Sequence, residues 1–266
     1  MTISPNKSKE RMKEIYKQIT ELNRVSKQCQ SPKQAVDDMM QLVFNLISQP
    51  SFSALQFPNS FVWANESLLR VLDRYMDDTQ AWEILVELTN EYMALVKDSE
   101  PFTDLLSVNY GDSGLSKALG QFLTPPCVAK ALPAFLGADK CEKLERGEHI
   151  AIAELCSGAG TLMLSMLEQI YQAYPNRMNQ VHVVAMDLDP NMVRMTSVQI
   201  ALSALVHGIE LGSFEVFWGN AIVDYLYAED KDTRGFIFTP NQDNHRALMK
   251  QFEEKAKQFI AMMEAA

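Results

Sequence analysis

The sequence predicts an α/β fold, a doubly wound parallel sheet truncated after its third or fourth strand, preceded by an all-helical N-terminal region. Three observations support it. Apolar residues recur at helical spacing through the first hundred residues. Beyond Gly111, short β-branched runs alternate with amphipathic segments, as in parallel strands joined by helices. A small-residue turn at 156–160 joins the first strand to its helix. We therefore expect a helical domain over 1–110 and an α/β domain over 111–266.

Composition limits the class of protein. The chain has 266 residues, of which 47% are hydrophobic and 22% charged, as in ordinary globular proteins. Its four cysteines lack paired spacing, so neither a disulfide framework nor a metal site is expected. No uncharged apolar run reaches about 18 residues, and the lysine-rich start does not resemble a signal peptide. These features predict a cytoplasmic protein with no membrane association.

Charge is unevenly distributed along the chain. The formal net charge is −10, which argues against tight nonspecific DNA binding. Residues 1–33, however, hold eight Lys and Arg against three Asp and Glu. Such a basic segment is compatible with weak DNA contact, but a solvated helix face is the more common meaning of a charge run and is the favoured interpretation.

The helical region divides at its proline and serine residues. Ser31 followed by Pro32 is typical of a helix N-cap and first helical position. Pro50 and Pro58 bracket an expected loop. Helices are expected over 8–27, 32–48, 66–76 and 81–96.

The second region alternates in type. Thr124 and Pro125 form an N-cap and first-turn pair for a helix. Strands are expected over 148–155, 181–187 and 214–218, with a short fourth at 235–239. Helices are expected over 128–135, 161–174, 190–206 and 241–266.

The turn after the first strand suits the close approach of a ligand. Gly158 and Gly160 remove side chains that would block it, and the following helix offers unpaired N–H groups. Glu154, at the strand end, would accept hydrogen bonds from an amino group. The full dinucleotide fingerprint is absent, because no third glycine follows. A plain tight turn is the alternative.

Two further polar residues end strands. Asp187 closes the second strand, where a carboxylate binds ribose hydroxyls in doubly wound sheets. The alternative is that Asp187 caps the next helix, although Asp189, before Pro190, is better placed to do so. Asn220, after Gly219, would face the same crevice or form a simple turn.

Together these segments carry a resemblance. GQFLTP at 120–125 is similar to the GQFYTP segment of adenine-specific DNA methyltransferases of the type I restriction–modification modification-subunit group. ELCSGAG at 154–160 resembles their DPACGSG turn, AMDLDP at 185–190 their GQEIDP segment, and Gly219-Asn220 their GD pair. The order and spacing agree over roughly residues 100–225. The resemblance implies a Rossmann-like methyltransferase fold.

In that family these segments hold S-adenosylmethionine. The resemblance implies that Glu154 binds its amino group, Asp187 its ribose and Asn220 its adenine. Phe122 and Thr124 would lie beside its methionine portion. The residues expected at the cofactor are Gln121, Phe122, Thr124, Glu154, Ser157, Gly158, Asp187, Leu188 and Asn220.

The sequence departs from the family at the acceptor site. No Asn-Pro-Pro segment occurs, and the nearest sequence, Thr239-Pro240-Asn241, has another order and no adjacent aromatic residue. No catalytic residue is therefore assigned. One interpretation is an adenine methyltransferase completed by a partner chain. Another is a catalytically silent relative that serves as a binding module. A small-molecule methyltransferase is disfavoured by the GQFLTPP segment.

Truncation also predicts association. A sheet that stops at its fourth strand leaves an open edge, which natural sheets seldom expose. The 15 methionines could provide an adaptable apolar surface, although a core role is more common. We expect a homo-oligomer or a complex with a partner subunit.

Overall fold

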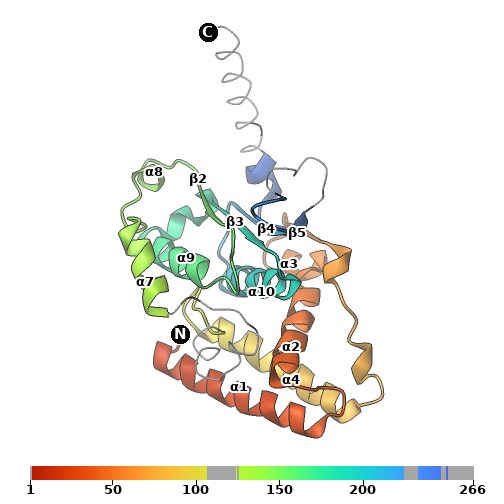
Figure 1. Cartoon of the computed structure of the whole chain (residues 1–266). Coiled ribbons are helices and arrows are strands. Elements are labelled where there is room, and N and C mark those ends of the chain that lie inside the picture. Colours follow the sequence, from red (N-terminus) through yellow and green to blue (C-terminus); the bar gives the residue numbers. More distant parts are fainter. Residues whose placement is uncertain (1, 107–123, 125, 225–232, 247–249, 251–266) are drawn as a thin grey trace.

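The computed structural model describes residues 2–106, 124, 126–224, 233–246 and 250. They form a five-stranded sheet in the order β1-β5-β4-β3-β2, with helices layered beneath it (Figure 1). The α/β class expected from the sequence is confirmed. The sheet, however, is mixed and not wholly parallel.

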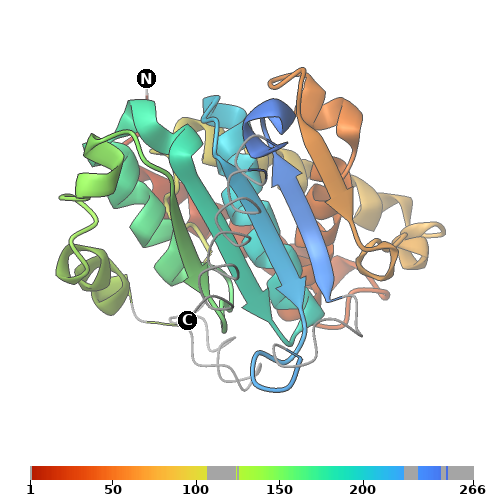
Figure 2. The same ribbon diagram turned by 90° about the horizontal axis from the view of Figure 1, so that it is seen from above.

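Three strands form the parallel part. They are β2 (Ile150–Glu154), β3 (Val181–Asp187) and β4 (Ser213–Trp218), joined by α9 (Thr161–Ala173) and α10 (Pro190–His207). The chain steps across the sheet in one direction, so right-handed crossovers place both helices on the same face. Figure 2 shows the sheet in front of them. One half of a doubly wound sheet has this arrangement, so these connections are compatible with the expected fold without confirming it.

The other two strands are antiparallel. β5 (Arg234–Thr239) pairs with β4, and β1 (Phe61–Ala64) pairs with β5. β1 lies in the region expected to be all helical, so that expectation was also wrong. Its sequence, FVWA, is rich in residues that favour strands, but four residues are too few for a visible periodicity.

The N-terminal helices form further layers below α10 (Figure 1). α2 (Pro32–Ile47) packs on α10, and α4 (Thr79–Asp98) and α1 (Pro5–Val25) pack on α2 and on each other. Ser31 caps α2 as expected, because its side chain accepts a hydrogen bond from the Gln34 N–H at 3.1 Å.

Some expected elements differ in type. A short helix, α3 (Pro50–Ala54), lies in the expected loop. The expected helix over 66–76 is instead two 3₁₀ turns, η1 (Glu66–Leu68) and η2 (Asp73–Tyr75). The remaining elements are α7 (Pro126–Phe135), α8 (Glu142–Glu145) and η3 (Pro175–Gln180). The expected C-terminal helix is described only over 242–246 and at 250.

One hydrophobic core joins the helices to the sheet. α10 lies between the sheet and α2, and every residue from Met192 to Leu205 is buried. Phe44 of α2 contacts Phe236 of β5, with ring centroids 5.6 Å apart. The expected domain boundary at 110 lies outside the described residues. No described helix has both the length and the apolar character that a bilayer span requires.

Candidate functional site

The carboxyl ends of the three parallel strands meet at one edge of the sheet. Glu154 ends β2 and Asp187 ends β3, while Asn220 follows β4 by two residues. Strand register places Asp187 beside Trp218 and Glu154 beside Ala185. Figure 2 shows the arrowheads of β3 and β4 side by side. The sheet therefore brings together three of the residues that the sequence singled out.

The loop between β2 and α9 depends on glycine. Gly158 has φ 53° and Gly160 has φ 90°, both in the left-handed region that favours glycine. A Cβ atom on Gly160 would also lie 3.4 Å from the Thr196 side chain of α10. The loop thus lies close against α10.

Two side chains of α10 hold this loop. The Thr196 hydroxyl donates to the Gly158 carbonyl at 2.7 Å, and the Gln199 amide donates to the Ala159 carbonyl at 2.6 Å. Sequence reasoning missed both residues. Their signal was the presence of polar residues on a helix whose other residues are mostly apolar.

Asp187 joins the loop to the start of α10. Its Oδ2 accepts from the Gly158 N–H at 2.8 Å, and its Oδ1 accepts from the Asp189 N–H at 2.9 Å. An ionised carboxylate has about four acceptor positions, so about two remain for a ligand. Asp189 is the N-cap of α10, because its side chain accepts from the Asn191 N–H at 2.8 Å.

Glu154 is the incompletely satisfied member of the site. Its Oε2 is buried and has no hydrogen-bond partner in the described part of the chain. Burial raises the pKa of Glu154 to about 7, the backbone of Met163 opposes the rise, and the charge of Asp187 adds to it. A cation placed here would offset both carboxylates.

Asn220 is used within its own loop. Its Oδ1 accepts from the N–H groups of Ile222 at 3.0 Å and Val223 at 3.3 Å. Its own N–H donates to Asp224 at 2.7 Å. The side-chain oxygen thus closes a turn, which was the alternative to an Asn220 side chain that faces the crevice.

The remaining expected residues occupy different positions. Ser157 is buried and its N–H donates to the Met186 carbonyl at 2.9 Å. Leu188 is 64% exposed and offers apolar surface, as does Ile222, which was not among the expected residues and is 81% exposed in the loop after β4. Thr124 is half-buried, while Gln121 and Phe122 lie outside the described residues.

Metal binding and similarity to known proteins give no further assignment. No group of three or more His, Cys, Asp or Glu side chains is arranged to hold a metal ion within the described ranges. A comparison with protein-family models gave no match, and comparisons with curated proteins and with solved structures gave none either. The site is therefore interpreted from its own geometry: two carboxylates, a glycine loop and an exposed apolar rim.

Proposed function

We propose that the protein binds S-adenosylmethionine and belongs to the class of DNA methyltransferase-like proteins specific for the adenine amino group. Glu154 is the observation that carries this proposal. A half-buried carboxyl with an unpartnered oxygen and a raised pKa matches a ligand that supplies an ammonium group. The resemblance of the surrounding segments to the methyltransferase family supports S-adenosylmethionine as that ligand.

The rest of the site agrees in chemistry with the same ligand. The free acceptor positions of Asp187 suit a ribose diol. Leu188 and Ile222 offer apolar surface for a base. S-adenosylmethionine also carries a positive sulfonium, which suits a site with two acidic groups.

An inactive, cofactor-binding or interaction module is the second candidate function, and one observation favours it. Thr239-Pro240-Asn241 is the segment most similar to the missing Asn-Pro-Pro motif, and it begins at the last residue of β5. Because β5 is antiparallel, Thr239 pairs with Phe61 and Phe238 pairs with Phe214, at the start of β4. This segment thus lies at the edge of the sheet opposite to Glu154 and Asp187, and it does not replace the acceptor motif.

A partner chain would reconcile the two candidates. β2 is the last strand of the sheet among the described residues, and it carries Glu154 at its end. A strand supplied by a second copy or another subunit would pair along β2 and bring its own polar groups to the acceptor side. Light scattering at increasing protein concentration tests self-association, and a strict monomer with no recovered partner contradicts it.

Calorimetric titration at pH 8 tests the cofactor. Wild type is expected to bind S-adenosylmethionine, and Glu154→Gln is expected to bind about ten- to a hundredfold more weakly, because a hydrogen bond to a charged group contributes about 1.5–3 kcal/mol. Glu215→Gln, the same change on β4, is the matched control and should bind as wild type. No heat with wild type would reject the proposal.

A methyl-transfer assay then separates the two candidates. Labelled S-adenosylmethionine and adenine-containing DNA are incubated with the protein alone. Transfer by the protein alone supports the enzyme, whereas binding without transfer, also when any recovered partner is added, supports the silent module.

A further inference from the structure

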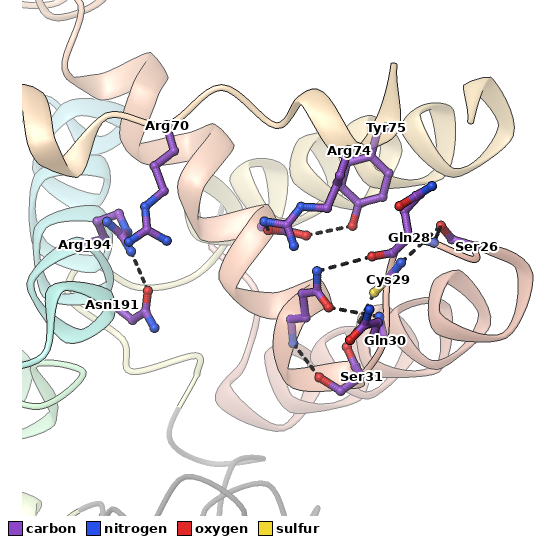
Figure 3. A network of polar contacts seen from close by, with 12 residues as sticks. Ser26, Gln28, Cys29, Gln30, Ser31, Arg70, Arg74, Tyr75, Asn191 and Arg194 are labelled. Carbon is purple, nitrogen blue, oxygen red and sulfur yellow. Dashed lines mark hydrogen bonds and ion pairs between the residues drawn. The ribbon is translucent and has the colours of Figure 1, made fainter. Parts of the chain in front are cut away.

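Two arginines lie close together beside the first turn of α10. Arg194 belongs to α10 and is 2% exposed. Arg70 is exposed and comes from the segment between η1 and η2. Figure 3 shows the guanidinium of Arg70 directed toward that of Arg194. Like charges placed together in this way repel unless an anion lies between or beside them.

The hydrogen bonds of Arg194 go to uncharged acceptors. Its guanidinium donates to the Leu68 carbonyl at 3.3 Å and to the side-chain oxygen of Asn191 (Figure 3). A guanidinium has five N–H donors, so several remain unused. Neither arginine forms an ion pair with any residue that the structure describes. Burial, and then the charge of Arg70, lowers the pKa of Arg194 to about 10.

Nearby acids do not complete the pair. Asp37 and Asp189 attract Arg194 electrostatically and Asp38 attracts Arg70, but Asp38 pairs with Arg74, and among the described residues none of these acids forms an ion pair with Arg70 or Arg194. The Oδ1 atom of Asp37 is buried and has no hydrogen-bond partner in the described chain. Burial foremost raises the pKa of Asp37 to about 6; Asp189 and Asp38 add to the rise, while Lys33 and Arg194 oppose it.

We propose that Arg70 and Arg194 form a binding site for a phosphate group. Paired guanidinium groups present parallel N–H donors that fit phosphate oxygens, and the N-terminal turn of a helix also favours an anion. α10 starts directly after the segment 187–189, so the phosphate would bind beside the helix that follows Asp187 in the chain. The ligand is either a free phosphate ester or the backbone of a nucleic acid. The second source rests on the proposed function.

Binding of inorganic phosphate and of a short adenine-containing DNA duplex, measured on the full chain at pH 7.5, tests the site. Arg70→Gln is expected to weaken binding of its ligand by about tenfold or more, as for loss of a charge-assisted hydrogen bond. For DNA, the slope of log affinity against log salt should fall by about 1. Arg74→Gln is the matched control, because Arg74 is four residues away and faces Asp38 at 3.5 Å. It should bind as wild type.

A third variant, Asp37→Asn, is expected to strengthen anion binding, whereas Arg70→Gln weakens it. Asp37→Asn removes a negative charge close to Arg194, so it should bind the anion several-fold more tightly. A structural role for Asp37 alone would not produce this gain.

The outcomes separate the sources and the proposals. Weaker phosphate binding by Arg70→Gln with unchanged DNA binding supports the site and assigns it to a free phosphate ester. Weaker DNA binding supports the nucleic acid. Equal binding by wild type, Arg70→Gln and Arg74→Gln overturns the site. S-adenosylmethionine has no phosphate, so its titration reports on the proposed function independently.

Discussion

The polar side chains at the amino ends and at the carboxyl ends of β2 and β3 differ in how completely they are hydrogen-bonded. At the amino ends, His149 Nδ1 and His182 Nε2 are hydrogen-bonded at 2.9 Å, and His182 Nδ1 and Ser213 Oγ are also bonded at 2.9 Å. At the carboxyl ends, the buried oxygen of Glu154 has no such partner among the described residues. The same two strands thus carry one polar cluster that is complete and one that is not.

His182 and Glu154 are both shifted toward the neutral form by burial, and they differ in how many of their polar atoms are hydrogen-bonded. Burial, followed by the charges of His149 and His245, lowers the pKa of His182 to about 4. Burial raises the pKa of Glu154 to about 7. Both changes favour the neutral form, but only His182 has all of its polar atoms engaged. The amino end is therefore a structural cluster, and the carboxyl end is where a ligand would supply the missing contact.

His182→Leu is expected to have the largest effect. It removes both ring nitrogens and leaves His149 and Ser213 without this partner, at a cost of about 3 kcal/mol in unfolding free energy. Urea denaturation at pH 8 measures the loss. Cofactor affinity should not change, and a loss below about 1 kcal/mol would contradict the structural role.

Glu154→Gln is expected to raise the free energy of unfolding, whereas His182→Leu lowers it. The folded protein keeps the Glu154 proton up to about pH 7, whereas the ordinary pKa of the group is 4.5. Stability from this group is therefore lost as the pH rises from about 4.5 to 7. The variant should lack this loss and gain about 1–2 kcal/mol at pH 8.

Denaturation of both proteins at pH 5 and pH 8 checks this prediction. The difference between the variant and wild type should grow with pH. A difference independent of pH would mean that Glu154 is ionised throughout the range, and the comparison between the two strand ends would fail.

The sequence predicted the parallel half of the sheet well because its patterns are local. The strand expected at 181–187 is β3 itself, and the Ser31 cap of α2 is confirmed. The turn at 156–160 has the positive φ angles that its glycines suggested. Such features follow from the residues of one short segment.

What the sequence did not predict depends on distant partners. β1 becomes a strand because β5 lies beside it, more than 170 residues later in the chain. The direction of β5 is likewise decided by its neighbours in the sheet. At the site, the oxygen of Asn220 is occupied by backbone N–H groups, which only the turn geometry reveals. The GQFLTP segment stays a prediction, since most of it lies outside the described residues.

Asp187→Ala is expected to have an intermediate effect. A residue that only held ligand would leave folding intact, but Asp187 also bonds the Gly158 and Asp189 N–H groups. Its loss should cost about 1–2 kcal/mol and weaken cofactor binding about tenfold or more. Denaturation and calorimetry on the same variant measure the two effects. A stability loss with unchanged affinity would reject the ribose role of Asp187.

Asp189→Ala should have the smallest effect and should affect folding only. The side chain of Asp189 caps α10 through the Asn191 N–H, and loss of an N-cap costs about 1 kcal/mol. Its backbone N–H, which binds Asp187, is kept in the variant. Cofactor affinity should therefore equal that of wild type, and Asp189→Asn, which retains a capping oxygen, should restore most of the stability. Ser31→Ala, at the cap of α2, gives the reference cost for a cap far from the site. If Asp189→Ala lost affinity while Ser31→Ala did not, Asp189 would belong to the ligand site together with Asp187.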